Sequence, residues 1–117
     1  MSRFTHLATT TVDVLRLEEV ETRPGAWSRE FVAVTVALGS RIAPAGAREM
    51  MVAEQMRVVA SHVLYTEPDA GVHVQDELLE TAGLNAGRRF RVTGLLPPSV
   101  PHHLKALLEE IQVATPA

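Results

Sequence analysis

The stretch of residues 47–96 changes its hydrophobic period twice, and this change limits the possible folds more than any other feature of the sequence. Residues 47–57 are good helix formers, whereas residues 58–66 switch to β-branched and aromatic side chains. Turn-forming residues follow at 67–71, and residues 88–96 alternate with the two-residue period of a half-buried strand. The stretch therefore predicts a helix followed by strands that pair in an antiparallel sheet.

The strand expected at residues 88–96 has one apolar and one polar face. The apolar face is expected to hold Phe90, Val92 and Leu96. The polar face is expected to hold Arg89, Arg91 and Thr93. Residues 82–87, with their glycines and Asn85, have the spacing of a hairpin turn that leads into this strand.

The basic cluster Arg88, Arg89 and Arg91 has two interpretations. It could form a nucleic-acid patch on a small barrel, or it could pair with Glu77 and Glu80 across the hairpin. Cross-strand pairing explains the arginines without nucleic acid, so we expect ion pairs between the two strands.

Residues 31–38 give the strongest strand signal in the chain. Four apolar side chains at alternate positions share one face: Val32, Val34, Val36 and Leu38. We expect the three valines to be buried in one barrel with Phe90 and Val92. Replacing Val34 by Asp is then expected to prevent folding, because an unpaired charge is costly to bury.

The N-terminal third predicts a second strand and a loop. In residues 12–17 the apolar side chains change face after Val14, and this phase slip predicts a β-bulge. Residues 18–28 contain several charged side chains and a Pro-Gly pair, and we interpret them as a long hairpin loop. Trp27 in that loop is expected to pack on the end of the barrel, with an interface as the less favoured interpretation.

The helix expected at residues 47–57 has only about three turns and must dock on another element to be stable. Met50, Met51 and Met56 are most simply its core face. Methionine also adapts to irregular partner surfaces, so an interface is the alternative. Near the C-terminus, the leucines of residues 103–113 have the spacing of a helix face, and local propensity alone predicts a helix there.

Composition limits the function. A chain of 117 residues is large enough for one core, so we expect a single domain with residues 1–10 as a flexible N-terminal arm. The net charge of −3 argues against tight binding to a phosphate backbone. With no cysteine, disulfides, thiolate metal sites and cysteine nucleophiles are excluded. No signal peptide or membrane span is recognisable, so we expect synthesis in a cytoplasm and no membrane partner.

No arrangement of residues predicts a catalytic, cofactor or metal site. His102 and His103 are adjacent, which is poor spacing for two ligands of one ion. Ser61 and His62, with Asp69 or Asp76, supply the residue types of a triad, but no positioning motif accompanies them. We therefore expect a structural or binding protein without a cofactor, not an enzyme.

The order of the elements resembles that of the head-closure proteins, also called head-tail stopper or head-tail joining proteins, of long-tailed double-stranded DNA bacteriophages. The likeness covers residues 12–112, and its best-matching pieces are Arg-Glu at 48–49, Ser-His-Val-Leu-Tyr at 61–65 and Arg-Phe-Arg-Val at 89–92. It implies a mainly β fold: a small antiparallel barrel of five to six strands with one short helix between the second and third. It also implies that residues 103–113 form a strand, against their helical propensity.

The resemblance implies a structural protein of the virion neck. Such a protein forms a ring, twelve-fold or six-fold, beneath the portal and adaptor, closes the DNA exit channel after packaging and presents the surface where tail-terminator or tail-tube proteins dock. Double-stranded DNA passes without sequence-specific binding. By the same likeness, residues 39–57 lie toward the channel or a neighbouring subunit, and the expected contacts are Arg41, Arg48, Glu49, Met51 and Arg57. The free chain is expected to be a monomer that forms a ring only on the connector.

Three alternatives remain open at this point. The chain could be a neck adaptor or tail-terminator ring protein of the same virion class. It could be a small β-barrel metal-binding or enzymatic module, which metal analysis and a turnover screen would detect. An OB-like nucleic-acid binder would need aromatic stacking positions, and this chain has few aromatic residues.

Overall fold

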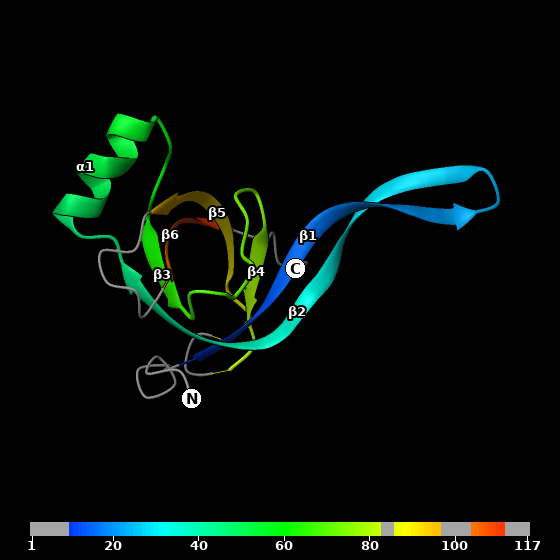
Figure 1. Cartoon of the computed structure of the whole chain (residues 1–117), viewed down its shortest axis with the longest axis horizontal. Helices are drawn as coiled ribbons and strands as arrows, with labels where there is room; N and C mark the ends of the chain where they lie inside the picture. The colour runs from blue at the N-terminus through cyan, green and yellow to red at the C-terminus, as the bar shows by residue number, and fades with distance from the viewer. Residues whose placement is uncertain (1–9, 83–85, 97–103, 112–117) are drawn as a thin grey trace, which may run out of the picture.

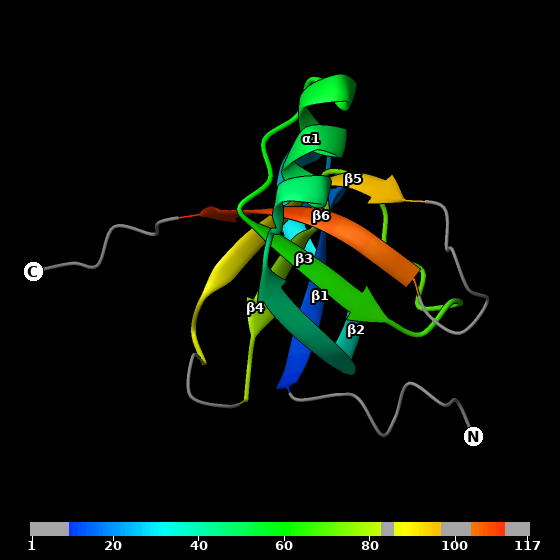
Figure 2. The same cartoon turned by 90° about the vertical axis from the view of Figure 1, so that its left-hand side faces the viewer.

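The computed structural model describes residues 10–82, 86–96 and 104–111. These residues form a closed antiparallel barrel with one helix on its outside (Figure 1 and Figure 2). The elements in chain order are β1 (Thr10–Arg23), β2 (Ala26–Pro44), α1 (Ala47–Met56), β3 (His62–Thr66), β4 (Glu77–Glu80), β5 (Arg89–Leu96) and β6 (Leu104–Ile111). The strand order around the barrel is β1-β2-β3-β6-β5-β4. The expected antiparallel barrel of five to six strands with one short helix between the second and third is confirmed, and the barrel has six strands.

Two long, bent strands take part in closing the barrel. β1 pairs with β4 only through Val12 to Leu15, and β2 pairs with β3 only through Arg41 to Pro44. The bulge expected near Val14 is confirmed, because the β1–β2 register shifts on both sides of that residue. Opposite it, Ala37 has a positive φ of 54°, and its N–H donates to Asp13 Oδ1 at 3.0 Å. The bulge lets the same two strands serve the barrel at one end and project from it at the other.

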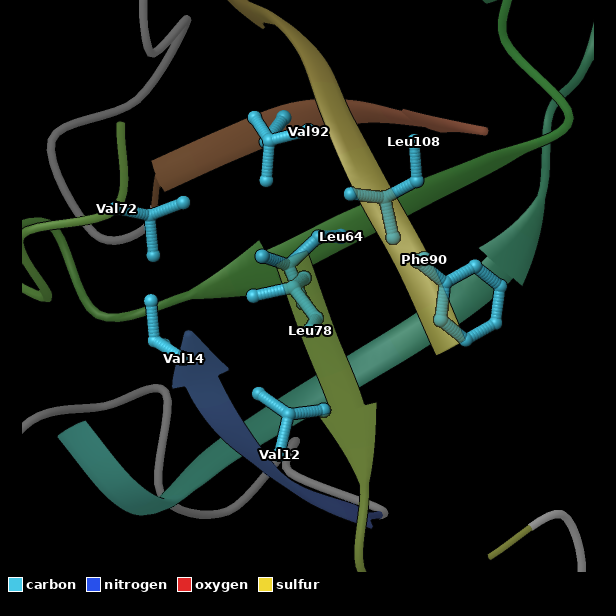
Figure 3. Packing of buried hydrophobic residues seen from close by; sticks show 9 residues of the cluster. Val12, Val14, Leu64, Val72, Leu78, Phe90, Val92 and Leu108 are labelled. Atoms are coloured by element: carbon cyan, nitrogen blue, oxygen red, sulfur yellow. The ribbon is translucent and has the colours of Figure 1, made fainter. Parts of the chain in front are cut away.

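The barrel is filled by small aliphatic side chains around one aromatic ring. Figure 3 shows these side chains pointing toward one another from different strands. Phe90 is fully buried, and its ring centroid lies 5.2 Å from that of His62, in an edge-to-face arrangement, and 5.1 Å from the Arg88 guanidinium carbon. The main core cluster consists of Val12, Val14, Leu64, Val72, Leu78, Phe90, Val92, Ala106 and Leu108.

A second, smaller cluster lies between the barrel wall and α1. It consists of Ala53, Ala60, Val63 and Leu107, with Leu96 partly buried beside it. Leu96 was expected on the same face as Phe90, and this is wrong: the β5–β6 register shifts between Val92 and Gly94, which moves the later residues of β5 to the other face.

β6 shows why helical propensity misleads at the C-terminus. It pairs with β3 on one side and with β5 on the other, so the strand that the resemblance implied is confirmed over Leu104–Ile111. Leu108 belongs to the barrel core, whereas Leu107 faces the cluster under α1. A strand buried on both faces needs a continuous apolar run, which periodicity cannot distinguish from a helix.

The expectation of a long hairpin loop at residues 18–28 is wrong. β1 runs to Arg23 and β2 begins at Ala26, so these strands pair down to a tight turn at Pro24 and Gly25, where Gly25 has a φ of 80°. Beyond the barrel they form a two-stranded ribbon, here defined as residues 16–36 (Figure 1). The described part of the chain places no third strand beside it.

The expectation that the valines of residues 31–38 are buried in the barrel core is also wrong. Val34 is 38% exposed and Val36 is 69% exposed, and Val32 is only half-buried. Trp27, expected to pack on the barrel end, is 63% exposed. Their alternation reflects the pleat of a real strand, but this part of the strand lies outside the barrel, where none of the described elements covers these side chains.

Candidate assembly surface

The basic cluster on β5 is used within the chain. Arg88 Nε lies 3.2 Å from Glu80 Oε1, Arg89 Nε lies 3.5 Å from Glu77 Oε1, and Arg91 Nη2 lies 3.6 Å from Glu77 Oε2. Both glutamates are buried, with less than a tenth of their surface exposed to solvent. The expected cross-strand ion pairs are confirmed, and they account for the arginines without a nucleic-acid ligand.

The residues that could have formed a triad have separate structural roles. Ser61 Oγ lies 2.9 Å from His62 Nδ1 and accepts a hydrogen bond from the Glu110 N–H at 2.8 Å. Asp76 is paired with Arg16 instead. Among the described residues, no group of three His, Asp or Glu side chains could hold a metal ion. His102 and His103 lie outside the described residues.

A buried ion pair fixes the root of the ribbon to the barrel. Arg16 donates from Nε and Nη2 to the two carboxylate oxygens of Asp76, at 3.0 and 2.9 Å, and also to the Gly71 carbonyl at 2.8 Å. The bond to Asp76 is the main cause that raises the pKa of Arg16. The His73 N–H donates to the same carboxylate, which is 2% exposed. This bidentate pair holds the loop before β4 against the ribbon.

One face of the ribbon carries three exposed apolar side chains that the sequence interpretation missed. Leu17 pairs directly with Phe31, and Trp27 pairs with Glu21 further out on the same face. The pair formed by Glu19 and Arg29 lies between them on this face. Leu17, Phe31 and Trp27 are 38%, 40% and 63% exposed, respectively. At the root of the ribbon a hollow of about 350 Å³ is lined by Leu17, Arg29, Val74 and neighbouring residues. The pairing of apolar positions across a Pro-Gly turn was the available signal.

The outward surface of α1 is the second exposed apolar region. Ala53 is the only residue of the helix that is fully buried, while Met50 and Met51 are 55% and 61% exposed. The core role expected for these two methionines is therefore wrong. Met56 is 41% exposed, yet its Cε lies 3.0 Å from where a Cβ on Gly94 would stand, so it partly covers that glycine.

The five residues expected at a subunit contact fall into three settings. Arg48 and Met51 are exposed on one side of α1, three positions apart. Arg57 ends the helix with a positive φ of 58°, and Arg41 is exposed on β2 opposite Tyr65. Glu49 differs, because it is half-buried and already paired within the chain.

Glu49 links α1 to the barrel. Its Oε1 accepts a hydrogen bond from Lys105 Nζ at 2.7 Å, and that bond is the main cause that lowers the pKa of the carboxyl group below its ordinary value of 4.5. Its Oε2 lies 2.9 Å from where a Cβ on Gly46 would stand, so the glycine before the helix makes room for this carboxylate. The Lys105 ammonium also lies 5.6 Å from the Tyr65 ring centroid.

The lowered pKa of Glu49 predicts an acid-dependent loss of stability. The unfolded carboxyl group binds a proton more readily, so the pair stabilises the fold above a pH of about 4.5, and this contribution is lost as the pH falls through the lower folded-state pKa. Glu49→Gln should flatten the acid side of the stability profile, by a modest amount because solvent screens the pair. Urea unfolding at stepped pH measures this. Glu54→Gln, an exposed change on the same helix, is the control, and identical profiles for wild type and Glu49→Gln would contradict the prediction.

Comparison with known proteins supports the fold alone. Neither a protein-family model nor a curated protein matches the sequence. The solution structure of protein SF1141 from Shigella flexneri 2a, a structural-genomics target, is similar with a TM-score of 0.71. That match covers 88% of this chain and 92% of the other at 13% sequence identity. Within the described residues, no helix has the length and apolarity needed to cross a bilayer.

Proposed function

We propose that this chain is a structural subunit of the neck of a long-tailed bacteriophage, where it forms a ring at the head-closure position. The observation that carries the proposal is the contrast between a complete barrel core and two projecting elements with uncovered apolar side chains. A monomer gains little from such surfaces, whereas an assembly can bury them. The sequence resemblance supplies the particular assembly.

In this role the barrel is the rigid body of each subunit. The ring lies beneath the portal and adaptor, closes the DNA exit channel and presents the docking surface for tail-terminator or tail-tube proteins. A net charge of −3 suits a conduit through which DNA must slide, because a strongly basic wall would bind the phosphates. Arg41, Arg48, Met51 and Arg57 remain the proposed contacts toward the channel or the next subunit.

Two other functions compete with this proposal. An adaptor or tail-terminator ring protein would use the same exposed surfaces, and the position of the chain in the particle distinguishes these roles. A small metal-binding or enzymatic barrel would need a site. The hollow at the ribbon root is lined by Arg16, His73 and Asp76, but Arg16 and Asp76 neutralise each other there. Metal analysis and a turnover screen test this second alternative.

Deleting the reading frame from the phage or prophage that encodes it tests the proposed function. Without a head-closure ring, filled heads should lose their DNA and free tails should accumulate, because the channel stays open and the docking surface is missing. Electron microscopy of lysates measures this, and a plasmid copy of the wild-type chain is the control that restores tailed particles. Full, tailed, infectious particles from the deletion would contradict the proposal, and so would adjacent genes that encode no portal or tail proteins.

A further inference from the structure

We propose that the ribbon of one subunit lies on the outward surface of α1 of the next subunit, in a head-to-tail contact. This inference rests on the proposed ring. In that ring, the ribbon of the neighbouring subunit is the surface that covers Arg48 and Met51. The partner is a second copy of this chain. The contact joins two regions where the described fold leaves large apolar side chains exposed.

The ribbon needs a partner on physical grounds. A two-stranded ribbon is marginally stable alone in water, and within the described part of the chain residues 16–36 form strand pairs only with each other. The edge formed by β1 carries Glu18, Glu19 and Glu21, and charged side chains on an edge discourage the addition of another strand. A partner is therefore favoured on a face of the ribbon. The face that holds Leu17, Trp27 and Phe31 also holds Glu19, Glu21 and Arg29, so a partner there must offer both apolar and basic side chains.

The outward surface of α1 complements this face in chemistry. Met50 and Met51 are flexible apolar side chains that can follow an irregular surface of aromatic rings. The hollow beside Leu17 and Arg29, about 350 Å³, gives such a side chain a place to insert. Burying methionine against Trp and Phe also favours sulfur–aromatic contacts.

The charges of the two surfaces are opposite. The ribbon from Leu17 to Phe31 carries four glutamates and two arginines, so it is net acidic. On α1 and its end, Arg48 and Arg57 face solvent, whereas Glu49 is already neutralised by Lys105. Glu54 is the one acidic side chain on the exposed surface of α1. Such complementarity orients the two surfaces and disfavours ribbon–ribbon contacts.

The geometry makes the contact intermolecular. Figure 1 shows the ribbon and α1 projecting from opposite sides of the barrel, so one chain cannot bring its own two surfaces together. Two different patches meeting head to tail form a heterologous interface, which closes into a ring when the rotation between subunits allows it. A contact of this kind also leaves the barrel core of each subunit intact.

Site-specific cross-linking tests the contact, and a chain with no cysteine gives a clean background. One variant carries Arg29→Cys, on the ribbon face between Trp27 and Phe31, and a second carries Gln55→Cys, one turn after Met51. Neither change removes an apolar contact residue. The two proteins are mixed at high concentration with a short bis-maleimide, because the free chain is expected to be monomeric and encounters must be trapped.

The mixture of Arg29→Cys and Gln55→Cys should give covalent dimers about tenfold faster than the control mixture. The control combines Gln55→Cys with Asp69→Cys, which lies at an exposed turn position. A tenfold difference corresponds to about 1.4 kcal/mol of contact free energy. Either variant alone should cross-link at the control rate. Equal or faster dimers from Arg29→Cys alone, or from Gln55→Cys alone, would overturn the head-to-tail contact. A mixed rate no higher than the control would also overturn it. The deletion phenotype is independent of this assay, so failure here leaves the neck function standing.

Discussion

Phe90→Ala is expected to lower the free energy of unfolding by about 3–5 kcal/mol, the range measured when a buried Phe is truncated. Phe90 has no exposed surface and is the one large aromatic side chain in the main core cluster. Its removal leaves a cavity that the surrounding residues, held by the closed barrel, can fill only in part. A domain of this size is stable by about 5–15 kcal/mol, so the loss is a large share of the total. Urea unfolding followed by circular dichroism measures it.

Phe31→Ala is the matched control, because the same atoms are removed from the ribbon. Phe31 is 40% exposed and lies outside both buried clusters, so its truncation should cost less than about 1 kcal/mol. Equal losses for the two variants would show that the ribbon is part of the cooperative core. That result would contradict the division of the molecule into barrel and projection.

The contrast between these two phenylalanines shows what the sequence could predict. Residues 31–38 and 88–96 both alternate, and both are strands. Alternation reports the pleat of the backbone, but it does not report whether another element covers the apolar face. β5 is flanked by β4 and β6, whereas β1 is the single described strand beside the outer part of β2. The expectation that Val34→Asp prevents folding is withdrawn for this reason.

The ribbon was the main feature missed, and its signal was weak for a physical reason. Residues 18–23 are mostly charged, and charged residues are uncommon in strands that are buried on one face. A projecting ribbon has no such requirement, because both of its faces meet solvent or a partner. The two-residue Pro-Gly turn, with positive φ at Gly25, fixes its register and was visible in the sequence.

The contact role of the candidate surface stays a prediction. Arg48, Met51, Arg41 and Arg57 are exposed as a contact role requires. Glu49 was expected to pair across subunits, but its partner Lys105 belongs to the same chain, 56 positions away. No local pattern can reveal a pair formed by packing a helix on a strand so distant in sequence. The elements themselves were easier to foresee than the contacts between them.

Arg48→Glu is expected to abolish assembly while leaving the fold unchanged. Arg48 is the second residue of α1 and is exposed, and a carboxylate near a helix N-terminus interacts favourably with the helix dipole. The change therefore does not weaken the helix. On an acidic partner surface, however, it replaces attraction by repulsion, and losing one partner of a desolvated charge pair costs about 2–5 kcal/mol per contact. The cost recurs at every contact around a ring, so few complete rings should form.

Arg48→Lys is the control for this change. It keeps the positive charge but loses the planar, bidentate geometry of the guanidinium, so it should assemble with reduced efficiency instead of failing. Both variant proteins should melt at the wild-type temperature, within the small range typical of exposed substitutions. A lowered melting temperature for Arg48→Glu would mean that its defect arises from folding.

Electron microscopy of lysates from the deletion strain, complemented with wild type, Arg48→Lys or Arg48→Glu, tests the central claim most directly. That claim is that surfaces exposed on the monomer become buried in the neck of a virion. The account predicts that wild type gives tailed, DNA-filled particles and that Arg48→Lys gives fewer of them. For Arg48→Glu it predicts empty heads and free tails. Full, tailed, infectious particles with Arg48→Glu would remove Arg48 from the assembly contact, and the same particles without any copy of the chain would contradict the account as a whole.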